Sequence, residues 1–224
     1  MPLHHYFFYA MVGIEIIFLV PFTLKFSYFN KEERLIYAYL VTCVIYGIGS
    51  DLLARIFGNN MAFISCIYLV QFIILSLFYI NVLKSPFAKK ALKWIMLAAA
   101  ILFTVDITLL EGPLKFNSVF IAFRSALLIV YGVMFFLQLM RDEGLIEKSI
   151  YINSLPVFWF NAGLFVNVCC GFLLNLSFNL IQQKGPGEVL VSMYKITAAL
   201  YWIAGIIQVI LFYIGLVKIK RARA

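Results

Sequence analysis

Long apolar runs, separated by short polar stretches, fill almost the whole chain of 224 residues. A helix needs about 20 consecutive apolar residues to cross the hydrocarbon core of a bilayer, and most of the runs reach that length. The pattern therefore predicts an all-α polytopic membrane protein, a seven-transmembrane-helix bundle that forms a single domain over residues 1–224. We expect spans near residues 6–24, 35–57, 61–83, 91–110, 117–139, 156–180 and 189–217.

Composition supports a membrane protein. Hydrophobic residues make up 64% of the chain and charged residues 12%, whereas soluble domains are about one quarter charged. Seven spans leave no room for a separate soluble catalytic or DNA-binding domain. The net charge of +8 is distributed over the loops between spans, so we expect the lipid bilayer as a partner and no nucleic acid.

The distribution of Lys and Arg predicts the orientation of the bundle, because basic loop residues stay on the cytoplasmic side. Loops on one side carry thirteen basic residues, whereas the opposite loops carry Lys115 and Lys184. We therefore expect the amino terminus outside, the carboxyl terminus inside, and a multi-pass protein of the inner (plasma) membrane. The first run has no convincing cleavage site, so we expect it to stay as a span. The thirteen are Lys25, Lys31, Arg34, Lys84, Lys89, Lys90, Lys93, Arg141, Lys148, Lys218, Lys220, Arg221 and Arg223.

Six ionisable residues interrupt the apolar runs, and each costs several kcal/mol in hydrocarbon unless it finds a partner or water. Counting about 1.5 Å per residue places all six in the outer half of the membrane. Asp51 and Arg55 have the i, i+4 spacing of an ion pair on one helix face. The cations Arg124 and Lys195 lie on other helices, and the acids available to pair with them are Asp106 and Glu15. The set could be a buried ion-pair network or the wall of a polar cavity. Its members are Glu15, Asp51, Arg55, Asp106, Arg124 and Lys195.

Amide and hydroxyl side chains favour the cavity. Four asparagines of the sixth span, residues 161, 167, 175 and 179, share an arc of about 120° on a helix. Such groups either hydrogen-bond neighbouring helices together or face water. Together with the deep charges they predict an outward-facing polar pocket, in which Arg124 and Lys195 contact an anionic group. The predicted ligand-binding residues are Glu15, Asp51, Arg55, Gln71, Asp106, Arg124, Asn167, Asn175, Lys195 and Tyr201.

The segment P-V-F-W-F-N-A-G-L at residues 156–164 resembles a family of small bacterial seven-helix membrane proteins that carry P-x-F-W-x-x-x-G-L in the next-to-last helix. The resemblance extends to residues 59–72 and loosely to 116–120. It implies seven helices and a bacterial source, and supplies no function. It also implies an acidic residue where this chain has Gln71.

Three classes of function fit this pattern. A sensory or accessory subunit would bind a small polar or amphiphilic ligand in the pocket and act through a separate signalling partner, since the chain has no output domain. The longest inner connection, residues 140–155, is the candidate docking surface for that partner. A small-molecule transporter would need polar residues in the inner half as well, where few occur beyond Asn161 and Gln208. We therefore favour the subunit.

The third class is an intramembrane lipid-modifying enzyme. A zinc hydrolase would need several converging histidines, but the only histidines are His4 and His5 at the outer terminus, so we expect no metal site. An acid pair of Glu15 with Asp51 or Asp106 stays possible for proton transfer. We expect no cofactor, and the sequence favours a protein that is not an enzyme.

Overall fold

The structure is a computed structural model that describes residues 3–144 and 151–222. Every element in these residues is helical, and seven of the helices are long and apolar enough to cross a membrane. The prediction of an all-α, seven-span protein is confirmed. The long helices are α1 (Leu3–Leu24), α2 (Lys31–Phe57), α3 (Met61–Val82), α4 (Pro86–Val105), α5 (Ser118–Met140), α7 (Pro156–Lys184) and α8 (Glu188–Ala222), with short turns η1 (Phe26–Tyr28), η2 (Asp106–Leu110) and η3 (Ile152–Ser154).

Several helices continue past the predicted spans because capping, and not hydropathy, decides where a helix begins or ends. At the start of α2, the Asn30 side chain accepts a hydrogen bond from the Glu33 amide at 3.0 Å, and the Glu33 carboxylate accepts one from the Asn30 amide at 2.8 Å. This capping box satisfies backbone donors outside the apolar run. α2 ends at Gly58, whose positive φ of 70° favours glycine.

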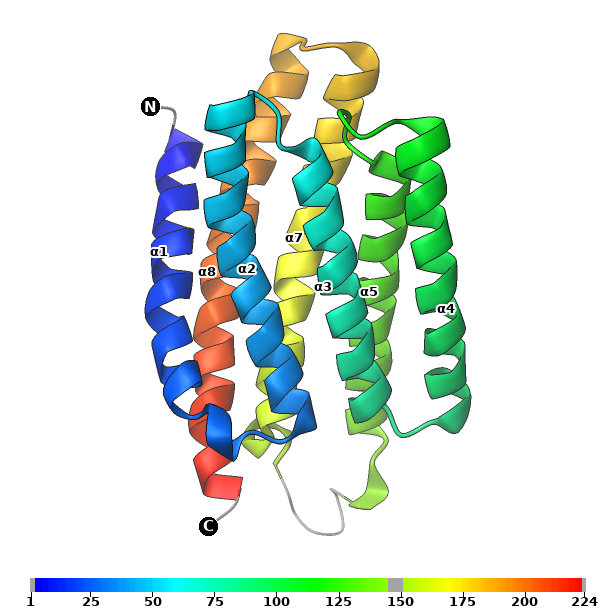
Figure 1. Ribbon diagram of the computed structural model, residues 1–224. Coiled ribbons are helices and arrows are strands. Elements are labelled where there is room, and N and C mark those ends of the chain that lie inside the picture. Colours follow the sequence, from blue (N-terminus) through cyan, green and yellow to red (C-terminus); the bar gives the residue numbers. More distant parts are fainter. Residues whose placement is uncertain (1–2, 145–150, 223–224) are drawn as a thin grey trace.

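The helices alternate in direction, and consecutive helices pack side by side (Figure 1). α8 also packs against α1, so α1, α2, α3, α5, α7 and α8 form a closed ring. α4 lies outside this ring and packs against α3 and α5. The first and last helices therefore lie together at one edge of the bundle, and α4 lies at the opposite edge.

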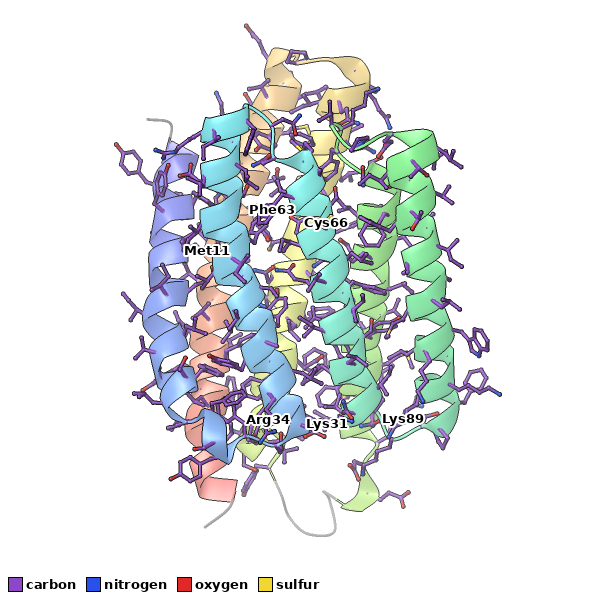
Figure 2. All side chains as sticks on the ribbon, viewed as in Figure 1. Met11, Lys31, Arg34, Phe63, Cys66 and Lys89 are labelled. Atoms are coloured by element: carbon purple, nitrogen blue, oxygen red, sulfur yellow. The ribbon has the colours of Figure 1, made fainter. Side chains whose placement is uncertain are left out.

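The connections divide into two ends. We call the end where the chain begins the N-face; it contains the connections around residues 58–60, 111–117 and 185–187 (Figure 1). The other end, the C-face, contains the connections after α1, α3 and α5. Lys31 and Arg34 on α2 and Lys89 on α4 all lie at the C-face (Figure 2).

The half of the bundle nearest the C-face is filled by aromatic and aliphatic side chains. Phe78, Phe160 and Phe212 are fully buried, and the rings of Phe160 and Phe212 meet edge to face at 5.6 Å. The Tyr79 hydroxyl donates a hydrogen bond to Asn161 Oδ1 at 2.8 Å, and Asn161 Nδ2 donates to the Gly132 carbonyl at 3.3 Å, so these polar groups bind one another. This half is a packed core.

α7 and α8 approach closely through glycine in that core. A Cβ on Gly163 would lie 3.0 Å from the backbone oxygen of Gln208, and one on Gly215 would lie 2.6 Å from the Phe160 ring. Small residues at such contacts let membrane helices pack tightly. The two helices therefore form a firm wall on which the site at the N-face is built.

Candidate ligand-binding site

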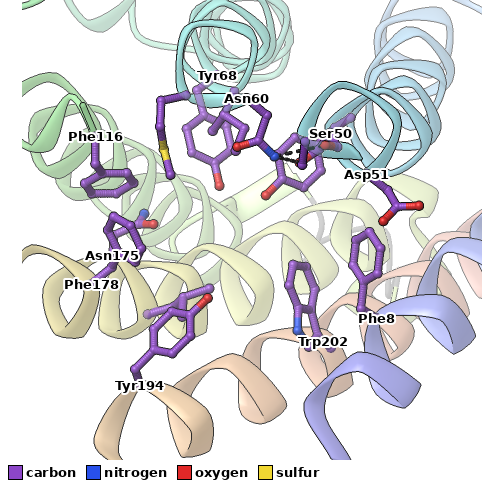
Figure 3. A pocket seen from close by; sticks show the side chains of 15 residues that line it. Phe8, Ser50, Asp51, Asn60, Tyr68, Phe116, Asn175, Phe178, Tyr194 and Trp202 are labelled. Atoms are coloured by element: carbon purple, nitrogen blue, oxygen red, sulfur yellow. Dashed lines mark hydrogen bonds between the residues drawn. The ribbon is translucent and has the colours of Figure 1, made fainter. Parts of the chain in front are cut away.

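A cavity of about 290 Å³ opens between the helices at the N-face end of the bundle (Figure 3). Its walls come from α1, α2, α3, α7 and α8, together with the connections before α3 and α5. Side chains far apart in the sequence therefore converge on one space. The lining residues are Phe8, Tyr46, Ser50, Asp51, Ala54, Asn60, Met61, Ile64, Tyr68, Phe116, Leu174, Asn175, Phe178, Tyr194 and Trp202.

Aromatic rings make up much of the wall of this pocket. Phe178 contacts Phe116 at a ring distance of 4.8 Å and Tyr194 at 5.8 Å, while Phe8 meets Trp202 edge to face at 5.1 Å. Such ring pairs hold one another in place. The result is a preformed apolar surface with polar groups at a few positions, as expected for a small-molecule site.

The predicted pair of Asp51 and Arg55 lies at the rim. Arg55 Nη2 is 2.9 Å from Asp51 Oδ2, which confirms the pairing expected from their spacing. Arg55 also donates a hydrogen bond to the Tyr9 hydroxyl at 2.9 Å. Asp51 lines the pocket, whereas Arg55 is exposed. An exposed pair of this kind contributes little stability, so its effect here is to neutralise Asp51, the one carboxylate among the described lining residues.

Arg124 lies behind the wall of the pocket. Its guanidinium carbon lies 4.5 Å from the centre of the Tyr68 ring, and its Nη2 donates a hydrogen bond to Gln71 Oε1 at 3.1 Å. No carboxylate of the described residues lies within 4.0 Å of this guanidinium. The expected ion pair with Asp106 or Glu15 is therefore wrong: Gln71, a neutral residue, takes that place.

Five tyrosines line the pocket or lie just beneath it, and we call Tyr39, Tyr46, Tyr68, Tyr194 and Tyr201 the tyrosine cluster. The Tyr46 and Tyr68 rings stack at 5.6 Å. The phenol groups of the cluster lie within electrostatic reach of one another, and those of Tyr39 and Tyr46 also reach Arg124. The cluster thus offers several hydroxyl donors near a cation. Sequence reasoning found only Tyr201 as a ligand-binding candidate.

Below the cluster, polar side chains cross the middle of the bundle. Gln71 donates from Nε2 to Cys43 Sγ at 3.7 Å, and Gln208 donates from Nε2 to the Tyr39 hydroxyl at 3.3 Å. Cys43 lies within electrostatic reach of both Glu15 and Arg124. Helices α1, α2, α3, α5 and α8 are thereby linked at one level. We call this group the polar centre: Glu15, Tyr39, Cys43, Gln71, Arg124 and Gln208.

Glu15 enters the polar centre from α1. Its side chain is 3% exposed, and Oε2 has no hydrogen-bond partner in the part of the chain that the structure describes. It faces the interior of the bundle, as predicted. Neither Glu15 nor Gln71 lines the pocket; both lie deeper.

Asp106 does not belong to the pocket, contrary to the prediction. It is fully buried, and its Oδ2 accepts a hydrogen bond from the Phe120 amide at 2.9 Å. Glu111 accepts hydrogen bonds from the amide and hydroxyl of Ser118. Both carboxylates therefore bind donors at the start of α5, where backbone amides lack helical partners and negative charge is favourable. We call Asp106, Glu111, Ser118 and Phe120 the α4–α5 corner.

Lys195 also departs from the prediction. Its side chain is exposed and does not line the pocket. The preceding residue, Tyr194, does line it, and the next position on a helix is turned by about 100°. Lys195 lies two turns from the start of α8, so its long side chain can extend along the helix toward the polar boundary of the membrane.

Three of the four asparagines in the predicted stripe of α7 face inward, whereas Asn179 is partly exposed and accepts a hydrogen bond from Gln183. Asn161 and Asn167 are buried, and Asn175 lines the pocket. Asn167 and Tyr201 lie below the pocket lining: a Cβ on Gly205 would lie 3.5 Å from Asn167 Nδ2, and one on Gly171 would lie 3.1 Å from the Tyr201 ring. These two residues pack between helices beneath the site.

Comparisons of the chain with protein-family models, with curated proteins and with solved structures found no match.

Proposed function

We propose that this protein is a sensory or accessory membrane subunit whose N-face pocket binds a small amphiphilic molecule and which acts through a partner protein. The observation that carries the proposal is the cavity of about 290 Å³, walled by aromatic rings from several helices and bordered by polar side chains. That volume lies at the lower end of small-molecule pockets, about 300–1,000 Å³. The ligand is therefore compact.

The C-face is the side we assign to the partner. It carries the basic connections, and the positive-inside rule places such connections in the cytoplasm. Residues 145–150 of the candidate docking segment 140–155 lie outside the described residues. In the described part, Lys84 Nζ lies 2.6 Å from Asp142 Oδ2 and joins two C-face connections.

The orientation has a direct test. We propose that the N-face lies outside an inner (plasma) membrane of a bacterial cell. A membrane-impermeant thiol reagent added to intact cells should label the new thiol of Lys184→Cys, near the N-face. It should not label that of Lys84→Cys, near the C-face. The reverse pattern would invert the proposed topology.

The pocket is tested by filling it. Asn175→Trp places a large ring in the cavity, whereas Leu176→Trp changes the neighbouring residue, which is exposed on the outside of α7. We expect Asn175→Trp to weaken binding of radiolabelled phenylbutanol to protein in nanodiscs at least about tenfold, and Leu176→Trp to leave it unchanged. Empty nanodiscs supply the background. Equal binding by the two variants would contradict a ligand site in this cavity.

The sealed C-face half favours a subunit over a transporter. A transporter would have to open this half, in which Phe78, Phe160 and Phe212 are fully buried and the rings of Phe160 and Phe212 are in contact. An acid-pair enzyme has less support, because Glu15 lies on α1 and Asp106 at the end of α4, on opposite edges of the bundle. Asp51, the other candidate, is paired with Arg55 at the rim.

A further inference from the structure

Arg124 is a buried cation without a counter-charge. It is 7% exposed, and within the described residues its Nε has no hydrogen-bond partner and one neutral acceptor, Gln71 Oε1, serves a group with five N–H donors. A charge removed from water in this way is costly unless an anion pairs with it. The fold tolerates this cation although a neutral side chain would cost less.

Arg124 is separated from the pocket by a single side chain, that of Tyr68. Tyr68 lines the cavity and at the same time contacts the guanidinium, and Tyr46, stacked on Tyr68, lines the same cavity. Their phenol groups can donate hydrogen bonds to an anion. An anionic group at this end of the pocket would meet two hydroxyl donors, with the positive charge of Arg124 directly behind the Tyr68 ring.

The other charged groups around the pocket do not compete for this role. Among the described residues that line the cavity, Asp51 is the only charged one, and Arg55 already pairs with it at the rim. Glu15 makes no ion pair with Arg124. Lys195 faces away from the cavity. The deep end of the pocket is therefore electropositive, and its rim is neutral.

We infer that the pocket binds a compact amphiphile with a single anionic group, a carboxylate or a phosphate, which Arg124 neutralises beside Tyr68. This inference rests on the proposed function. The cavity is too small for the two acyl chains of a phospholipid, and its aromatic walls suit a short apolar or aromatic tail. Tyrosine hydroxyls donate hydrogen bonds to carboxylate and phosphate oxygens alike, and the Arg124 charge behind Tyr68 favours either anion, so both fit the same site.

The test uses three probes with one tail: phenylbutyrate, phenylbutyl phosphate and phenylbutanol. Binding is measured to the full chain in phosphatidylcholine nanodiscs. We expect the better of the two anions to bind wild-type protein at least about tenfold more tightly than the alcohol. Comparison of the two anions shows whether a carboxylate or a phosphate is preferred.

Variants at Arg124 identify the group responsible. Arg124→Gln should reduce anion binding to the level of the alcohol and leave the alcohol unchanged, whereas Arg124→Lys should keep part of the preference. Lys195→Gln is the matched control and should keep all of it. Because Arg124→Gln removes an unpaired buried charge, the ligand-free variant should unfold at a temperature no lower than wild type. A structural role for Arg124 would instead lower that temperature.

The outcomes separate the two proposals. Equal binding of alcohol and anions to wild-type protein, or an anion preference that survives Arg124→Gln, would overturn the inference and leave the pocket intact. Failure of all three probes to bind would count against the proposed function as well. Displacement of the anionic probes by phosphatidylglycerol in the nanodisc would assign the anion to a lipid headgroup. It would overturn the inference that the ligand is a compact amphiphile.

Discussion

The α4–α5 corner and the polar centre both bury charged side chains, and they do so in opposite ways. In the corner, Asp106 and Glu111 accept hydrogen bonds from Phe120 and Ser118 at the start of α5. In the polar centre, Glu15 and Arg124 have no oppositely charged partner within 4.0 Å among the described residues. A buried charged side chain thus marks a candidate site only where no other group of the protein already binds it.

The first test of this contrast removes a carboxylate that accepts a hydrogen bond from the backbone. Asp106→Ala should leave the Phe120 amide without its acceptor, which costs about 1–3 kcal/mol for a buried donor. We expect the free energy of unfolding, measured in mixed detergent micelles, to fall by that amount. Asp106→Asn retains an acceptor oxygen and should recover most of it. If Asp106→Ala unfolds like wild type, the corner carboxylate has no capping role.

The second test removes a charge that the fold leaves unpaired, and the expected effect is smaller and of opposite sign. Glu15→Gln should raise the free energy of unfolding by about 1 kcal/mol or less, because an amide is cheaper to bury than a lone carboxylate. Glu143→Gln, at an exposed position on the C-face, is the control and should change stability by less than about 0.5 kcal/mol. A large decrease in the free energy of unfolding on Glu15→Gln would mean that the carboxylate has a partner.

The sequence predicted well those features that depend on neighbouring positions along one helix. Span number follows from apolar length, and the Asp51–Arg55 pair follows from its i, i+4 spacing. The inward direction of Asn161 and Asn167 follows from their shared arc. Each of these inferences needs only the geometry of a single helix.

The predictions that failed concern features that depend on how the helices are rotated relative to one another. Helices in lipid are apolar on all sides, so hydropathy does not show that Lys195 points outward while Tyr194 points into the pocket. Asp106 was misplaced because its partner, the Phe120 amide, lies on the next helix. Apart from Tyr201, the tyrosine cluster was missed because tyrosine counts as apolar in such patterns, although its hydroxyl is polar.

The packing of α8 against α1 has a consequence for how the protein is made. The chain enters the membrane from its first helix onward, yet the ring closes only when the last helix arrives. Until then α1 lacks one of the two helices that flank it, and the wall that carries Tyr194 and Trp202 does not exist. A ribosome-bound intermediate with six spans therefore has no pocket, and any capacity to hold a ligand arises at the final step of biogenesis.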